Sequence, residues 1–166
     1  MFVVRAVREN DLDGLYALAQ KAGAGLTTLP AHKPSLEEKI AASLSAFSAH
    51  ADMGEKQTYL LVMENKDTGQ VIGTSAVMAG VGLDRPFYTY RMLHLTQVST
   101  DPIKRVDTQL LQLSNDFIGA SEMATLFLDP DFRVGGLGKL LAKARYLLIA
   151  SHLERFSDPV ISEIRG

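Results

Sequence analysis

The sequence contains no cysteine, which excludes a disulfide, a thiolate nucleophile and a cysteine-ligated metal site. No apolar run approaches the length of a membrane-spanning helix, so no membrane partner is expected. The 17 Lys and Arg residues are balanced by 19 Asp and Glu residues, which argues against a nucleic-acid-binding surface. The N-terminal stretch is too short and too polar for a signal peptide, so we expect a cytoplasmic protein. The four histidines stand singly, without a carboxylate at ligand spacing, and we expect no metal site.

The length and composition are those of one folded domain. The chain has 166 residues, of which 46% are hydrophobic and 22% are charged. These values are ordinary for a globular protein, and the length is sufficient to bury a core. No internal repeat or low-complexity tract interrupts the sequence, so we expect residues 1–166 to form a single domain.

The most informative stretch, residues 125–141, reads as a strand, a tight turn and a helix. An apolar run at 126–128 ends at the turn signal Asp129-Pro130. Apolar residues then recur at three- and four-residue steps, which predicts a helix over 137–150. Three glycines occupy positions 135, 136 and 138, where the strand leads into this helix. Glycine permits sharp turns and close approach of a ligand, and unpaired N–H groups at a helix start attract anions. The stretch therefore predicts a phosphate-bearing ligand at the turn.

A glycine-rich turn alone is equally compatible with a helix entry that binds nothing. Two familiar phosphate loops are excluded. A dinucleotide fingerprint that starts at Gly136 needs glycine or alanine where Leu141 stands, and a Walker loop needs glycine at Arg133 and a hydroxyl residue at Leu140. What remains is the spacing Arg133-x-x-Gly136-x-Gly138 behind a strand.

The rest of the chain predicts a mixed architecture. Asn10 is expected to cap one helix, and the pair Ser35 and Glu38 forms a capping-box pattern at the start of another. Apolar patterns predict strands over 2–7, 58–63, 70–78, 87–98, 110–113 and 160–164. The strands at 58–63 and 70–78 form a hairpin, and we expect 87–98 to continue this meander. The predicted class is α/β (α+β), with a mixed, mostly antiparallel sheet flanked by helices.

The glycine motif resembles the acyl-CoA pyrophosphate loop of the GNAT superfamily of N-acyltransferases, and the order of elements is similar to the GNAT fold. A narrower resemblance, to the arginine N-succinyltransferase family, runs from residue 2 to residue 166. It is most specific in the block 114–133. The stretches that carry it are 25–30, 81–91, 113–122, 126–131 and 161–166.

This resemblance implies transfer of succinyl from succinyl-CoA to the α-amino group of L-arginine, in arginine degradation by the succinyltransferase pathway. Members of the family are roughly twice as long. We therefore expect a GNAT-like domain that lacks its C-terminal part, as the N-terminal fragment of a longer enzyme. The family's proton-donating histidine belongs to the other half. The histidines that do not match it are His32, His50, His94 and His152.

The acyl-CoA is expected to bind along the strand and the glycine turn. Leu126 matches the family position assigned to succinyl-CoA binding, and main-chain N–H groups near it are placed to meet the thioester carbonyl. The expected contacts are Leu126, Phe127, Leu128, Arg133, Val134, Gly135, Gly136, Leu137 and Gly138.

Amide formation from a thioester needs a proton acceptor for the amine. Glu122 is the candidate catalytic base, and Asp116 is a candidate for binding the substrate guanidinium. Arg91 is a candidate partner for the succinyl carboxylate, and Thr27 lies in a loop whose hydroxyls can meet a small polar ligand. Each has an ordinary alternative: a solvated carboxylate for Glu122, a turn residue for Asp116, and solvent-facing positions for the other two.

Two other functions stay open at this point. One is a non-catalytic CoA-binding or assembly module, and the other is an acyltransferase for another amine, such as ornithine. Because the helix at 137–150 needs cover and the strand at 160–164 lies near an edge, we expect the chain to form a homo- or hetero-oligomer. We also expect little succinyltransferase activity from the chain alone.

Overall fold

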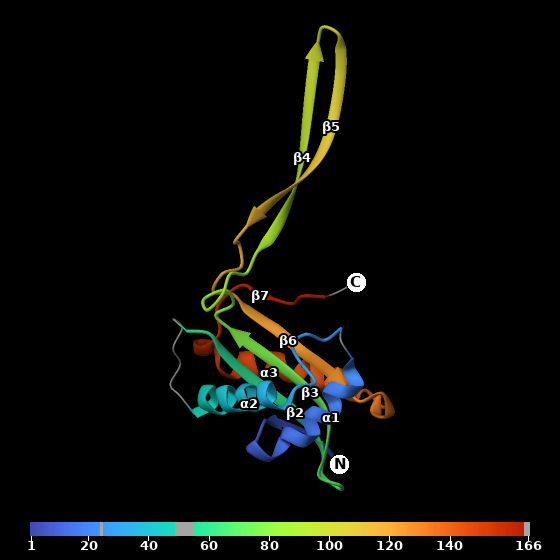
Figure 1. Ribbon diagram of the computed structural model, residues 1–166, viewed down its shortest axis with the longest axis vertical. Coiled ribbons are helices and arrows are strands. Elements are labelled where there is room, and N and C mark those ends of the chain that lie inside the picture. The colour runs from blue at the N-terminus through green and yellow to red at the C-terminus, as the bar shows by residue number, and fades with distance from the viewer. Residues whose placement is uncertain (24, 49–54, 165–166) are drawn as a thin grey trace.

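The structure is a computed structural model of the 166-residue chain, and it describes residues 1–23, 25–48 and 55–164 (Figure 1). Helices and strands occur both before and after a long antiparallel hairpin. In chain order they are β1 (Phe2–Ala6), η1 (Glu9–Asp11), α1 (Leu12–Ala22), α2 (Lys33–Ser48), β2 (Gln57–Asn65), β3 (Gln70–Ala79), β4 (Thr89–Thr100), β5 (Ile103–Ser114), β6 (Ser121–Leu128), η2 (Pro130–Phe132), α3 (Leu137–Ser151), η3 (Leu153–Arg155) and β7 (Val160–Ile161).

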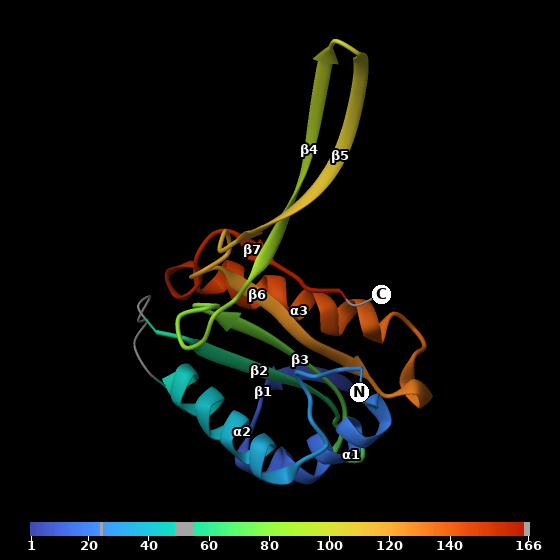
Figure 2. The ribbon, with the colours of Figure 1, turned by 45° about the horizontal axis from the view of Figure 1, so that its top comes forward.

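The central sheet has the strand order β1-β2-β3-β6-β7. Its pairings are antiparallel except for the last, in which β6 and β7 run parallel. Helices α1 and α2 lie on one face of the sheet and α3 on the other (Figure 2). The predicted class, a mixed and mostly antiparallel sheet flanked by helices, is confirmed.

Helices cover both faces of the sheet, which the apolar side chains on both sides of its central strands allow. Strand β2 is buried at six consecutive positions, which is the pattern of a strand enclosed from both sides. Leu60 and Val62 of β2 pack in one core cluster with the α1 and α2 side chains Leu15 and Leu36. The neighbouring Met63 packs on the opposite face in a second cluster that includes Leu141 of α3 and Leu128 of β6.

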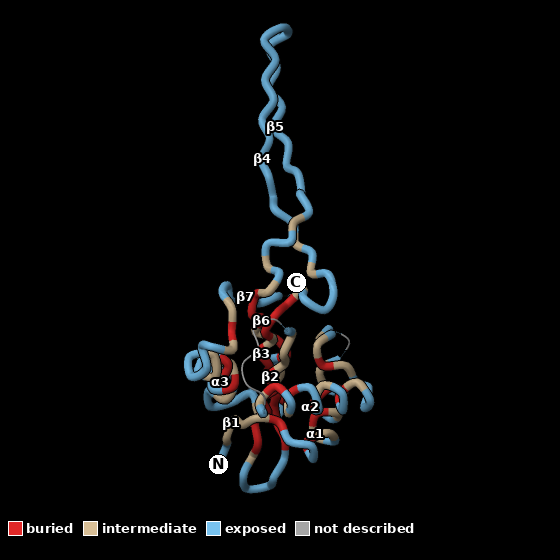
Figure 3. Tube along the Cα trace, turned by 90° about the vertical axis from the view of Figure 1, so that its left-hand side faces the viewer, coloured by how far each residue is buried: buried red, intermediate tan, exposed pale blue. Residues whose placement is uncertain are grey.

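Strand β4 does not continue the meander, so the prediction for residues 87–98 was wrong in its placement. Strands β4 and β5 pair only with each other, in a register from Thr89↔Ser114 to Thr100↔Ile103. We call this hairpin the arm. It projects from the central sheet and is exposed along nearly its whole length (Figures 1 and 3). The short strand expected at 110–113 is the end of β5. The alternating side chains predict that residues 87–98 form a strand, but they do not show which strand it pairs with. Strand β6, not β4, pairs with β3.

Three predicted element boundaries also differ from the structure. Asn10 is not a helix cap, because it lies inside the 3-10 turn η1 that precedes α1. Helix α2 begins at Lys33, so Ser35 lies in its first turn and its hydroxyl is 2.9 Å from His32 Nδ1. Strand β7 covers only Val160–Ile161 of the predicted 160–164, at the edge of the sheet as expected.

Candidate functional site

The sheet opens between β6 and β7. These strands pair at two positions, Ser121↔Val160 and Glu122↔Ile161. Strand β6 then continues to Leu128 without β7 beside it. The outer edge of β6 therefore offers main-chain groups to a ligand over its second half.

Strand β6 carries an irregularity in this open part. The β3–β6 register shifts between Thr74 and Ala76, and Thr125 of β6 has a φ of 51°. A threonine in this left-handed region is strained and requires support from its surroundings. The support comes from Lys39 of α2, whose Nζ donates to Thr125 Oγ1 at 3.0 Å and also to the main-chain oxygen of Thr28. The bulge is thus tied to the loop around residue 28.

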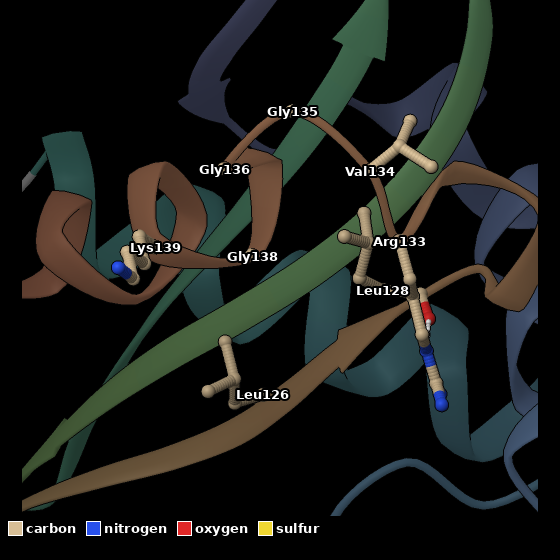
Figure 4. A pocket seen from close by; sticks show the side chains of 8 residues that line it. All are labelled: Leu126, Leu128, Arg133, Val134, Gly135, Gly136, Gly138 and Lys139. Carbon is tan, nitrogen blue, oxygen red and sulfur yellow. Dashed lines mark hydrogen bonds between the residues drawn. The ribbon is translucent and has the colours of Figure 1, made fainter.

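The glycine turn joins β6 to α3. Gly135 and Gly136 have φ values of 60° and 80°, and no atom lies within 4 Å of a Cβ added to either. Glycine is needed here for the backbone conformation, and the open space leaves room for a ligand to approach. Helix α3 starts at Leu137, and Gly138 and Lys139 of its first turn border this space. A cavity of about 380 Å³ lies there, lined by Leu126, Leu128, Arg133, Val134, Gly135, Gly136, Gly138 and Lys139 (Figure 4).

Seven of the nine predicted acyl-CoA contacts line this cavity, and two do not. The Phe127 side chain packs at the edge of the first core cluster. The Leu137 side chain packs against the cluster of Met63 and Leu141, and its N–H is bonded to Val134 O at 3.2 Å. Lys139, which sequence reasoning treated only as part of an excluded Walker loop, lines the cavity. The sequence could have indicated this role, because Lys139 is a cation in the first helical turn after the glycines.

Arg133 lines the cavity with its stem but turns its guanidinium away from the glycines (Figure 4). Its Nε donates to Leu128 O at 3.1 Å, and its Cζ lies 5.6 Å from the centre of the Phe127 ring. In this conformation the positive charges beside the turn are the helix start and Lys139.

A second cavity of about 560 Å³ also lies along β6, and Leu126 lines both cavities. It lies between the loop at 25–28, strand β6, helix α3 and the segment after β7. Each of these four elements contributes a polar or charged side chain to the lining. These side chains are Thr27, Glu122, Arg145 and Glu163. The structure therefore brings the predicted residues Thr27 and Glu122 together, next to the glycine turn.

The surroundings of Glu122 suit a catalytic base. Its side chain is only 9% exposed. Burial raises its pKa, and the neighbouring charge of Glu163 raises it further, while Lys56 and Lys39 act in the opposite direction. A carboxylate with a raised pKa accepts a proton more readily near neutral pH.

Arg91 and Asp116 lie elsewhere, at the base of the arm. Arg91 Nε and Nη2 bind the two oxygens of Asp116 at 2.6 and 2.7 Å. The hydrogen bond from Arg91 lowers the pKa of Asp116 to about 2. Neither residue lines the cavities described above, so the structure does not place them with Glu122.

Sequence analysis did not identify two cations that are shielded from solvent, Lys39 and Arg145. Burial lowers the pKa of Lys39 to about 8, yet its sequence position is that of any charged residue on a helix. Arg145 is 7% exposed and lies four residues after the fully buried Leu141 on α3. The helical period places Lys39 and Arg145 on the core-facing sides of their helices. That spacing could have predicted that both are shielded from solvent.

Two negative findings hold for the described residues. They include no group of three His, Asp or Glu side chains arranged to hold a metal ion. They also include no helix that is long and apolar enough to cross a membrane.

Comparison with solved structures places the chain among acyltransferases by fold. Arginine/ornithine succinyltransferase subunit AI from Pseudomonas aeruginosa superposes with a TM-score of 0.91 at 30% identity, over 100% of this chain and 50% of that one. Glucosamine-6-phosphate N-acetyltransferase from Arabidopsis thaliana superposes with a TM-score of 0.53 at 14% identity, over 99% of this chain and 83% of that one. The expected GNAT-like fold is confirmed.

Comparison of sequences narrows the assignment. Arginine N-succinyltransferases from Enterobacter sp. (strain 638) and Shigella dysenteriae are 42% and 40% identical to the chain over all 166 residues, which correspond to 48% of each relative. The chain thus spans about half the length of the curated relatives it matches. A family model described as arginine N-succinyltransferase beta subunit matches residues 2–166. The chain therefore belongs to the arginine N-succinyltransferase beta-subunit family.

Proposed function

We propose that this domain binds succinyl-CoA along the glycine turn and β6, and takes part in succinyl transfer to the α-amino group of L-arginine. The observation that carries the proposal is that the two cavities lie on the same strand, β6, and share the lining residue Leu126. One cavity has the helix start and its glycines, which suit a pyrophosphate. The other has a buried carboxylate, Glu122, which suits an amine.

The reaction follows from this arrangement. With the pyrophosphate at Gly135 and Gly136, the acyl chain extends along the open edge of β6 toward the bulge at Thr125. Main-chain N–H groups at this edge donate to the thioester oxygen as negative charge develops on it. The amine nitrogen attacks the carbonyl carbon, Glu122 takes the proton that the amine loses, and the C–S bond breaks.

The leaving thiolate must also take up a proton. Among the described residues, no histidine lines either cavity. A non-catalytic CoA-binding module is therefore the second candidate, since such a module needs the glycine turn but no proton donor.

The charge of the second cavity favours a cationic acceptor. Glu122 and Glu163 both line it, and their mutual repulsion is relieved when a cation binds between or beside them. L-Arginine and L-ornithine both satisfy this requirement. The name of the Pseudomonas aeruginosa protein includes both acceptors. We propose arginine because the family and the relatives with similar sequences are named for it.

The test uses the tagged chain in the assembly in which it is purified from its own cells. Release of free CoA thiol is followed with succinyl-CoA and L-arginine, for the wild type and Glu122→Gln. We expect arginine-dependent release that falls by roughly 10²- to 10⁴-fold in the variant, with unchanged CoA affinity measured by calorimetry. CoA binding without arginine-dependent thiol release from the wild type would favour the non-catalytic module.

A further inference from the structure

Arg145 is a buried cation without a counter-ion. Its side chain is 7% exposed and lines the second cavity. Its Nε donates to Ala142 O of its own helix at 3.3 Å. Within the described part of the chain, no carboxylate lies within ion-pair distance of its guanidinium.

The fold treats another shielded arginine differently. Arg5, whose side chain is 15% exposed, binds Asp11 at 2.7 Å and also binds Glu64. An arginine that is largely shielded from water and has no such partners retains part of the cost of losing its water. Burial lowers the pKa of Arg145, and the opposing effect comes from Tyr146 rather than from a carboxylate. The stabilising anion for Arg145 is therefore expected from a ligand.

We propose that Arg145 binds a carboxylate of the ligand in the second cavity. The inference rests on the proposed function, which supplies two such groups: the terminal carboxylate of the succinyl chain and the α-carboxylate of the amino-acid acceptor. A planar guanidinium binds a carboxylate through two parallel hydrogen bonds. Arg91, which the sequence suggested for the succinyl carboxylate, already holds Asp116 in this way.

The other charges of the cavity agree with this assignment. Glu122 and Glu163 line it together with Arg145, yet among the described residues neither carboxylate forms an ion pair with that guanidinium. The cavity therefore presents positive and negative groups that do not neutralise each other. Such a cavity fits reactants of both charges, a cationic acceptor and an anionic acyl group.

The experiment uses two pairs of ligands that differ by one carboxylate. Succinyl-CoA is compared with butyryl-CoA, in which a methyl group replaces the carboxylate. L-Arginine is compared with agmatine, which lacks the α-carboxylate. Binding of each is measured by calorimetry, the acceptors in the presence of CoA. The variants are Arg145→Met, Arg145→Lys and, as a matched control, Lys143→Met at an exposed position of the same helix.

For the wild type and Lys143→Met, we expect tighter binding of the carboxylate-bearing member of one pair by roughly tenfold to hundredfold. Arg145→Met is expected to lose this preference and Arg145→Lys to keep part of it, while all variants bind CoA alone like the wild type. If Arg145→Met loses the preference for succinyl-CoA over butyryl-CoA, Arg145 binds the succinyl carboxylate. If it loses the preference for L-arginine over agmatine, Arg145 binds the α-carboxylate.

Unchanged preferences for both pairs in folded Arg145→Met would overturn the assignment while leaving CoA binding at the glycine turn intact. Failure of the wild type to bind CoA would instead overturn the proposed function, and the assignment with it. Thermal unfolding followed by circular dichroism verifies that each variant is folded.

Discussion

Gly136 combines a left-handed backbone, with φ of 80°, and a position at the start of α3. A valine there strains the backbone by about 1–2 kcal/mol and places a branched side chain where the pyrophosphate would approach. We predict that Gly136→Val lowers CoA affinity by more than tenfold, as measured by calorimetry. Gly69→Val is the control, because Gly69 has φ of 72°, has no atom within 4 Å of an added Cβ, and lies in the β2–β3 turn. Equal CoA affinity for both variants would argue against the glycine turn as the binding site.

Lys39 makes stability depend on pH in an unusual direction. Burial lowers its pKa from 10.5 to about 8 in the folded protein, so between these values the unfolded chain binds more protons. Stability is therefore reduced at pH 8 and below, and it rises as the pH approaches 10.5. Relative to Lys39→Met, the wild type is predicted to gain about 1 kcal/mol in free energy of unfolding between pH 8 and pH 9.

Urea unfolding of both proteins at the two pH values measures this difference. Lys33→Met serves as the control, since Lys33 lies on the same helix and its pKa is raised by Asp13. A constant difference between wild type and Lys39→Met across this range would mean that the Lys39 amine titrates like a solvated lysine.

At the residue scale, the sequence predicted those site residues whose roles follow from their own chemistry or from adjacent residues. The glycine turn requires a backbone that only glycine adopts readily, and Glu122 and Thr27 meet in one cavity as candidates chosen separately. Lys39 has no local signature, since its role arises from contacts with Thr28 and Thr125, far along the chain. Arg91 and Asp116 were placed at the site because the sequence does not show that their segment leaves the sheet.

Helix α3 positions the glycine turn by packing one apolar side against the sheet. Leu141 is fully buried against Met63, Ile72 and Leu128. Truncating it leaves a cavity in this layer, and we predict that Leu141→Ala lowers the free energy of unfolding by about 2–4 kcal/mol. Leu147 on the same helix is 65% exposed, so Leu147→Ala is expected to change it by less than about 0.5 kcal/mol.

Chemical denaturation of both variants measures these costs. Similar small losses would show that α3 does not depend on Leu141 for its docking. CoA affinity of the folded Leu141→Ala protein adds a second reading, because a loosened α3 also disturbs the turn that precedes it.

At the element scale, local patterns predicted most helices and strands, whereas pairing was harder to predict. The hairpin β2–β3 follows from a turn of a few residues between two apolar runs. The β4 pattern reads equally well as a sheet strand or as part of the arm, because both need alternating side chains. Only the tertiary choice of β6 as the neighbour of β3 separates them. The two-residue strand β7 is likewise set by long-range pairing, since Ser121 and Glu122 are its partners.

At the scale of the whole molecule, the arm stands apart because its strands pair only with each other and do not join the central sheet. It carries apolar pairs on both of its faces: Met92 opposite Leu111 on one, and Leu93 opposite Leu110 on the other. These four side chains are between 41% and 67% exposed. A two-stranded hairpin alone is marginally stable in water, and exposed apolar surface of this kind favours association.

We predict that the purified chain self-associates through the arm, with a second copy covering these apolar pairs. Sedimentation velocity at increasing micromolar concentrations should show a growing dimer fraction. The double variant Met92→Thr, Leu111→Thr should reduce it, because both changes lower apolar area while keeping residues that suit a strand. Leu147→Thr on α3 removes a similarly exposed leucine outside the arm and should leave the dimer fraction unchanged. A wild-type chain that stays monomeric, or an equal effect of Leu147→Thr, would show that the arm is not the self-association surface.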